Sequence, residues 1–355
     1  MAIVTLKNIA RSGLDLTIHD REFVVLAGSE TSAIVRLIAG LENTSEGEIF
    51  FDDRQIDAIA PKDRDVALLA GDYTPYPRLS VTDNLAIGLR ERNFAEAEIK
   101  KRIAAVAMEL GLEKELEMNG QSLPPEQQRL VGLARVMVRQ PNVYLFDEPF
   151  AGLESEATRH GRAEIVKLHQ RSSATIVYAT SSPAEALAFG KRTVIVIDGV
   201  IQQDGSAQEI YNAPANLAVA RFFGEPPMNL IAGTLKQERD SLVFSEEGDG
   251  TIALSLPTDR FSGAKEFLAK SVVLGIRPED ISLEAGGSGF RALIQRTESR
   301  GGDTDLYLQT GAHSLIARNL CSAPAESGQR GQFRMALEKA LLFDAKSGRR
   351  VPPEA

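Results

Sequence analysis

The sequence predicts an α/β domain with a mostly parallel sheet, followed by a small all-β domain. Short apolar runs alternate with helical segments as far as residue 224, which is typical of a parallel sheet covered by helices. Beyond residue 232, short β-like runs are separated by Gly, Asp and Ser turns, as in an OB-like barrel. We therefore expect domains at residues 1–232 and 233–355, with a helical subdomain at about 83–140.

The elements follow one another in a regular order. Residues 3–51 read as short strands, a loop and an apolar helix. Residues 84–139 read as helical, with Thr82 or Asp83 as the expected N-cap. Later runs predict strands at 143–146, 175–180 and 194–199, the last turning at Asp-Gly into a hairpin, and β-like runs at 241–244, 272–276 and 305–308.

Composition narrows the class of protein. The chain of 355 residues has a formal net charge of −9, which argues against a nucleic-acid partner. Its single cysteine, Cys321, excludes internal disulfides and suits a reducing cytoplasm. We expect no signal peptide, and no apolar run approaches the roughly 20 residues of a membrane span. Any membrane role is therefore expected to act through a partner.

Residues 22–41 are the most informative segment, because they predict a buried strand, a short loop and an apolar helix. This is the frame of a P-loop, in which backbone N–H groups and a lysine hold phosphates. The loop is short, lacks the second glycine and the lysine, and places Glu30 where the phosphates would lie. The candidate nucleotide-binding residues of this degenerate Walker A loop are Gly28, Ser29, Thr31 and Ser32.

A second motif ends the predicted strand at 143–146. Asp147 and Glu148 have the form of a Walker B element, with Asp147 as a Mg²⁺ ligand and Glu148 as the catalytic carboxylate or a remnant of it. The alternative is an acidic turn whose carboxylates are strand-end hydrogen-bond acceptors. The neighbouring P-loop remnant favours the first reading.

Together these motifs resemble the ATP-binding subunit of an ABC importer of the carbohydrate-uptake class, whose members serve maltose, glycerol-3-phosphate and similar solutes. The resemblance covers nearly the whole chain. It implies an ABC-type P-loop nucleotide-binding domain with a helical subdomain, then an OB-like, TOBE-type regulatory domain. The matching segments are residues 22–28, 36–42, 76–81 with Asn84, Arg135, 146–149, 228–229 and 274–280, the last being specific to this class.

The sequence also departs from the family pattern at most nucleotide-contacting positions. Gly71 stands at the Q-loop position and Ser181 at the switch-histidine position, and the D-loop aspartate is Glu154. No aromatic residue precedes Phe23 to stack on adenine. The four histidines (His19, His160, His169 and His313) lie elsewhere and are interpreted as surface or helix residues.

The signature motif is altered as well. The degenerate motif runs from Leu123 to Gln127 and contains Pro124, Pro125 and Glu126 between them. The resemblance implies that Leu123 and Gln127 face the partner's nucleotide. Proline has no N–H to donate to a phosphate, although two prolines start a helix well. Each lost charge-assisted bond costs roughly 1.5–3 kcal/mol, and Glu126 adds repulsion. The alternative is a simple helix-entry loop.

The segment at residues 71–90 keeps most of its family side chains. The resemblance implies that it receives a permease helix, with Tyr73, Tyr76, Leu79 and Val81 as apolar and aromatic anchors. The alternative is a loop that faces the core.

The resemblance implies a degenerate subunit that acts beside a second, intact ATPase subunit, like one of the paired ATP-binding subunits of bacterial glycerol importers. We expect two transmembrane permeases, a solute-binding protein, a sugar, polyol or glycerol-like solute, and a peripheral location on the cytoplasmic face of the bacterial inner membrane. ATP and Mg²⁺ would bind mainly at the partner's site. Two alternatives remain open: a regulatory or scaffold protein without transport, and an active ATPase that binds ATP in an unusual pose.

Overall fold

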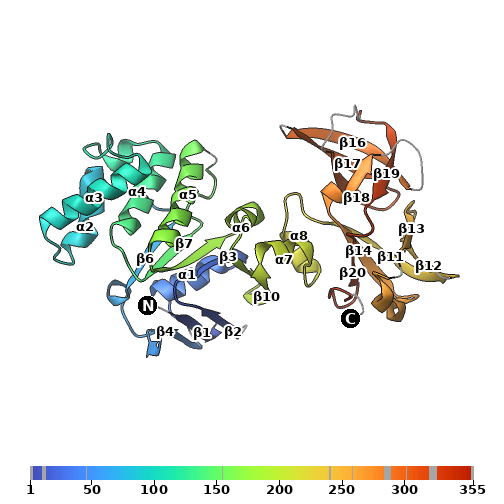
Figure 1. Cartoon of the computed structure of the whole chain (residues 1–355), viewed down its shortest axis with the longest axis horizontal. Helices are drawn as coiled ribbons and strands as arrows, with labels where there is room; N and C mark the ends of the chain where they lie inside the picture. Colours follow the sequence, from blue (N-terminus) through green and yellow to red (C-terminus); the bar gives the residue numbers. More distant parts are fainter. Residues whose placement is uncertain are drawn as a thin grey trace. The chain divides into compact units, whose positions relative to one another are not determined.

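The computed structural model divides into two compact units, Met1–Ala207 and Gln208–Ala355, and each is described by itself (Figure 1). Glu154 and Cys321, singled out above, lie outside the described residues. None of the described helices is both long and apolar enough to cross a bilayer. The structure describes residues 3–9, 13–44, 46–153, 155–239, 241–257, 259–283, 289–300, 302–319 and 326–352.

A mostly parallel sheet organises the first unit, as predicted. Its buried, apolar strands run in parallel from β9 to β6, and β10 pairs antiparallel at one edge. A separate antiparallel sheet has the order β2-β1-β4-β5. The strands are β1 (Val4–Ile9), β2 (Leu14–Ile18), β3 (Phe23–Gly28), β4 (Glu48–Phe51), β5 (Arg54–Gln55), β6 (Val66–Ala70), β7 (Val143–Asp147), β8 (Thr175–Thr180), β9 (Arg192–Ile197) and β10 (Val200–Ser206).

Helix α1 shares one apolar core with both of these sheets. The apolar side chains of α1 recur at helical spacing, which is why one face of it is buried. The parallel order β9-β3-β8-β7-β6 brings the carboxyl ends of β3, β7 and β8 to one edge, where the predicted Walker residues follow. The helices are α1 (Thr31–Ala39), α2 (Val81–Arg90), α3 (Glu96–Leu110), α4 (Pro125–Met137), α5 (Glu156–Arg171) and α6 (Pro183–Phe189).

The predicted helical stretch consists of α2, α3 and α4, but its expected N-cap is wrong. Ser80 caps α2, because its side chain accepts the backbone N–H of Asp83. Thr82 instead donates its hydroxyl to the Leu116 carbonyl. Serine, threonine and aspartate are all favoured N-cap residues, so only the residue at which the helix starts distinguishes Ser80 from Thr82 and Asp83.

The second unit contains two five-stranded antiparallel sheets over a common apolar core, which confirms the predicted all-β class. The first sheet has the order β13-β12-β11-β14-β20 and the second β15-β19-β16-β17-β18. The elements are α7 (Ala207–Asn212), α8 (Leu217–Phe222), β11 (Asn229–Glu238), β12 (Ser241–Glu246), β13 (Ala253–Leu256), β14 (Ser271–Ile276), β15 (Ile281–Leu283), β16 (Phe290–Arg300), β17 (Asp303–Gln309), β18 (Ser314–Asn319), β19 (Arg330–Met335) and β20 (Leu341–Asp344).

The two units divide at residue 207, earlier than the expected boundary at 232. The reason is the anchoring of α7 and α8 in the second unit. The buried guanidinium of Arg277 donates to the carbonyls of Phe223, at 2.6 Å, and Tyr211, at 2.5 Å. Ala220 of α8 also lies in one apolar cluster with Phe343. Both helices therefore belong with the β domain.

Candidate functional site: a P-loop remnant facing two strand-end carboxylates

The loop between β3 and α1 lies against strand β9. Gly28 has φ +132°, and a Cβ there would lie 1.9 Å from the Val196 carbonyl oxygen, so the close approach requires glycine. Ser29 donates its N–H to that carbonyl at 2.9 Å, and its Oγ accepts the Asp198 N–H at 3.0 Å. One loop amide that a phosphate cradle would need is therefore bonded within the protein.

Helix α1 begins without a side-chain cap. Glu30 occupies the N-cap position with a left-handed φ of +62°, and its carboxylate makes no capping bond. Its side chain is exposed at the positive end of the helix dipole, where a phosphate would bind in a working P-loop. A carboxylate at this place opposes the binding of a second anion.

Asp147 is held by two residues of α1. The Ser32 hydroxyl donates to Oδ1 at 2.5 Å, and the Arg36 Nε donates to Oδ2 at 3.3 Å. Asp147 is only 3% exposed, and a buried carboxylate needs hydrogen bonds and a countercharge. Arg36 supplies that positive charge at the point where a P-loop serine and a Walker B aspartate would hold Mg²⁺.

Glu148 is turned toward the strand-end segment after β8. It has a left-handed φ of +48°, its Oε1 accepts the Ser181 N–H, and its Oε2 accepts the Thr180 hydroxyl at 3.4 Å. A Cβ on Gly71 would lie 2.5 Å from the Glu148 carbonyl oxygen. The structure thus brings together the residues at the Q-loop, Walker B and switch positions, but gives the Glu148 carboxylate partners from within the chain.

These contacts test whether the chain's own residues fit MgATP. The loop has no lysine, and both oxygens of Asp147 accept from protein donors. The backbone N–H of Ser29 donates to the Val196 carbonyl, so it is not free to bind a phosphate. Within the described part of the chain, no group of three or more His, Cys, Asp or Glu side chains is arranged to hold a metal ion. The residues present therefore fit a magnesium triphosphate poorly.

The altered signature forms the start of α4. Pro124 occupies the N-cap position and Pro125 the first turn, and no side chain caps the helix. Both prolines are exposed, Leu123 is buried, and Gln127 is half-buried. In the described residues, no hydrogen bond or ion pair joins Leu123 or Gln127 to Asp147 or Glu148, and that these two residues face another subunit stays a prediction.

The four side chains predicted to dock a permease differ in how far they are exposed. Tyr76 is 41% exposed, whereas Tyr73 and Leu79 are half-buried. The Tyr76 hydroxyl accepts from Arg135 at 2.9 Å, and the guanidinium lies 4.6 Å from the ring centre. Val81 is fully buried at the start of α2, so its side chain offers no exposed anchor.

The buried side chain of Asn84 holds the backbone of this segment through hydrogen bonds. Its Oδ1 accepts the Tyr76 N–H at 2.7 Å, and its Nδ2 donates to the Ser80 carbonyl at 2.9 Å. Arg129 donates to the Tyr73 carbonyl at 2.5 Å, and burial raises the pKa of the Tyr73 hydroxyl above its usual value. A fully satisfied buried amide holds a loop in one conformation.

Sequence reasoning assigned no role to Arg36 or to the pair Arg162–Glu185. Glu185 accepts from Arg162 at 2.7 Å and from Thr180 at 2.7 Å, which orients the segment that contacts Glu148. A signal for Arg36 was present, because Ser32 and Arg36 are four residues apart and lie on one helix face. No local pattern signals the Arg162–Glu185 pair.

Three known protein families match parts of the chain. Residues 12–151 match the ABC transporter family, residues 224–281 the MalK OB fold domain, and residues 274–343 the TOBE domain.

Relatives match over nearly the full length. The chain is 35% identical to the oligosaccharides import ATP-binding protein MsmX of Bacillus subtilis, over 97% of this chain and 96% of the relative. It is 33% identical to the sn-glycerol-3-phosphate import ATP-binding protein UgpC of Bordetella pertussis, over 99% of both chains.

Solved structures share the fold of the first unit. A dimeric bacterial ABC transporter cassette matches with a TM-score of 0.52 and 21% identity, over 57% of this chain and 98% of the cassette. The same cassette in a post-hydrolysis state, bound to ADP and Pi, matches with a TM-score of 0.52 and 22% identity. With the fold, the Walker-type edge and the full-length relatives in agreement, this chain belongs to the ABC transporter ATP-binding proteins that carry a MalK-type OB fold and a TOBE domain.

Proposed function

We propose that this chain is a degenerate ATP-binding-type subunit of an importer for a sugar, polyol or glycerol-like solute. It acts with a different, intact ATPase subunit, two transmembrane permeases and a solute-binding protein, on the cytoplasmic face of the bacterial inner membrane. The import functions in the names of its full-length relatives support the transport assignment. ATP and Mg²⁺ bind mainly at the partner's nucleotide site.

The observation that carries the proposal is the Ser32–Asp147–Arg36 contact. It gives both oxygens of the Asp147 carboxylate a donor from within the protein, beside a loop that has no lysine. In a homodimer both sites would share this defect. A heterodimer with an intact partner keeps one complete set of Walker residues, and this chain contributes the altered signature at Leu123 and Gln127.

Permease docking is the second part of the proposal. Tyr76 and Leu79 offer accessible apolar surface, Tyr73 supports them, and Arg135 holds the Tyr76 ring. Exposed aromatic residues with a fixed orientation are typical anchors of protein interfaces. This surface would transmit closure of the ATPase pair to the permeases.

Native mass spectrometry of the membrane assembly, purified through a tag on this chain in MgATP, tests the composition. One copy of this chain beside a second ATPase subunit and two permeases, with nucleotide in unequal amounts, is the expected result. Two copies with two bound nucleotides would show that the shortened loop works. An assembly without permeases would favour the regulatory or scaffold function.

Turnover by the isolated chain tests the remaining alternative, an active ATPase. We expect no ATP hydrolysis above background from the purified chain, and none that Glu148→Gln removes. Hydrolysis that disappears in Glu148→Gln would contradict the degenerate assignment, because Glu148 would then act on water rather than only accept from Ser181 and Thr180.

Substitution of Tyr76 tests docking. Tyr76→Ala should lower the amount of permease that co-purifies by about tenfold, as for an interface anchor worth more than 1 kcal/mol. Its effect on the free energy of unfolding should stay within about 0.5 kcal/mol, because the side chain is 41% exposed. Exposed Met108→Ala on α3 is the matched control and should leave co-purification unchanged.

A further inference from the structure

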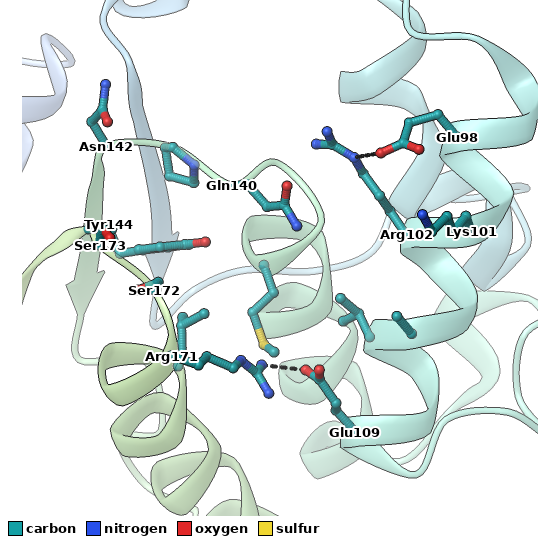
Figure 2. A pocket seen from close by; sticks show the side chains of 16 residues that line it. Glu98, Lys101, Arg102, Glu109, Gln140, Asn142, Tyr144, Arg171, Ser172 and Ser173 are labelled. Atoms are coloured by element: carbon teal, nitrogen blue, oxygen red, sulfur yellow. Dashed lines mark hydrogen bonds and ion pairs between the residues drawn. The ribbon is translucent and has the colours of Figure 1, made fainter. Parts of the chain in front are cut away.

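A cleft of about 640 Å³ opens in the first unit at the amino end of the parallel sheet (Figure 2). It lies between α3, the start of β7 and the end of α5. Tyr144 and Asp147 are three residues apart on β7, so roughly 10 Å of strand separates the cleft from the Walker-type edge. The proposed function does not use this cleft.

The strongest sign of a ligand site is the Tyr144 hydroxyl. Tyr144 is 1% exposed, yet Figure 2 shows its hydroxyl directed into the cleft. Among the described residues, no group forms a hydrogen bond with it. Burial raises the pKa of Tyr144 well above its usual value, so the phenol remains a proton donor. The hydroxyl oxygen itself is open to the cleft, so cleft water satisfies it until a ligand takes the place of that water.

A second polar atom in the wall also lacks a partner. The Ser172 Oγ is buried and has no hydrogen-bond partner in the described part of the chain. Ser172 directly follows α5 and Tyr144 lies at the start of β7, so residues of two separate elements line the same space, and the enclosed Ser172 Oγ reaches a ligand by rotation of its side chain. Val106, Met137 and Leu168 supply apolar surface between them.

The charged groups of the rim carry one more positive than negative charge. Lys101, Arg102 and Arg171 face Glu98 and Glu109. Arg102 is already engaged, because its Nε donates to Glu98 at 2.7 Å and its guanidinium lies over the Phe94 ring. Arg171 pairs with Glu109 at a half-exposed position, and no ion pair holds Lys101 within the described residues. Lys101 is thus the unpaired cation, and Arg171 is the more exposed of the two paired arginines.

We propose that this cleft binds a small organic anion, a carboxylate with a flat apolar body. Arg171 and Lys101 attract the carboxylate, the hydroxyls of Tyr144 and Ser172 donate to it, and Val106, Met137 and Leu168 contact the body. A neutral ligand would not neutralise the extra positive charge of the rim. Inorganic phosphate would leave the apolar surface in contact with water. A ligand here contacts α3 and α5 at once and braces the helical layer against the sheet.

Fluorine NMR line broadening with 4-fluorobenzoate, titrated onto the full chain, tests the proposal. We expect 4-fluorobenzoate to bind at least tenfold more tightly than 4-fluorobenzyl alcohol. Tyr144→Phe should weaken binding about tenfold, since it removes one hydrogen bond to a charged group. The same variant should unfold at the wild-type temperature, because the lost hydroxyl bonds to no described protein group.

Matched variants separate binding from structural damage. Tyr178→Phe removes another buried hydroxyl, on β8 and outside the cleft, and should leave the affinity unchanged. Arg171→Gln should weaken binding several-fold, whereas Glu109→Gln should strengthen it by releasing Arg171. If the Arg171–Glu109 ion pair were only structural, the two variants would change the affinity in the same direction.

Three results would overturn the proposal. They are the absence of broadening with the wild-type chain, equal affinity for the neutral alcohol, and binding that Tyr144→Phe leaves unchanged. Inorganic phosphate that displaces the probe at equal concentration would refute the role of the apolar surface.

Discussion

At the scale of single residues, Asp147 acts as a hydrogen-bond acceptor at the end of β7, beside a loop that has no lysine. Its oxygens accept from Ser32 and Arg36, so the carboxylate stabilises the packing of α1 on β7. The acceptor role that the sequence left open is therefore present in the structure.

Arg36→Gln measures what this contact contributes. We expect a loss of about 1–2 kcal/mol in the free energy of unfolding, less than for a fully buried pair because the Arg36 side chain is 42% exposed. Urea unfolding gives the value. Arg54→Gln is the matched control on exposed β5, and an equal loss there would remove the assignment to Asp147.

Gly71 is the residue whose role only the structure explains. Its Cα lies against the Glu148 backbone, so Gly71→Ala should cost about 1–3 kcal/mol through overpacking. Gly88→Ala should have the opposite sign, a gain of up to about 1 kcal/mol, because Gly88 lies in α2 with open space around its Cα. Urea unfolding of both variants is the measurement, and a gain in both would show that Gly71 is not sterically required.

At the scale of elements, the end of β12 contains a buried polar cluster. Glu246 accepts from Thr251 N–H at 2.8 Å, Ile252 N–H at 3.1 Å, His313 Nδ1 at 2.8 Å and the Thr310 hydroxyl. Burial alone would raise the pKa of Glu246, but these hydrogen bonds outweigh it and lower the pKa below its ordinary 4.5. The cluster ties the end of β12 to the β17–β18 turn.

This lowered pKa predicts a pH dependence of stability. The folded pKa lies below the unfolded value, so the stabilisation is present above about pH 4.5 and is lost as the pH falls through the folded pKa. Glu246→Gln should therefore destabilise the chain at pH 7 and have a smaller effect at pH 3. Urea unfolding at both pH values checks this, and a larger effect at pH 3 would reverse the sign that we assign.

The elements that the sequence could predict were those marked by a continuous apolar run or by characteristic turn residues. Strands β7 and β8 begin at the predicted residues, and Asp198 and Gly199 form the predicted hairpin turn, both with left-handed φ. The cap of α2 and the unit assignment of α7 and α8 differed, because a cap depends on one hydrogen bond and a unit boundary on contacts with distant strands.

At the scale of the whole molecule, two compact units predict separable unfolding. Gly88→Ala lies in the first unit and Glu246→Gln in the second. Scanning calorimetry should show two overlapping transitions, with Gly88→Ala raising one and Glu246→Gln lowering the other by a few degrees. A single transition that both variants move together would show that the units unfold as one.

The sequence by itself determined the fold class, the order of the elements and the family, because periodicity, turn residues and motif spacing are local properties. It also located the candidate residues at the ends of β3, β7 and β8. Tertiary structure alone decided what they contact. Ser32 and Asp147 are 115 residues apart, and Gly71 meets Glu148 only because β6 pairs with β7. Strand order and close backbone packing create these contacts, and no local pattern encodes either one.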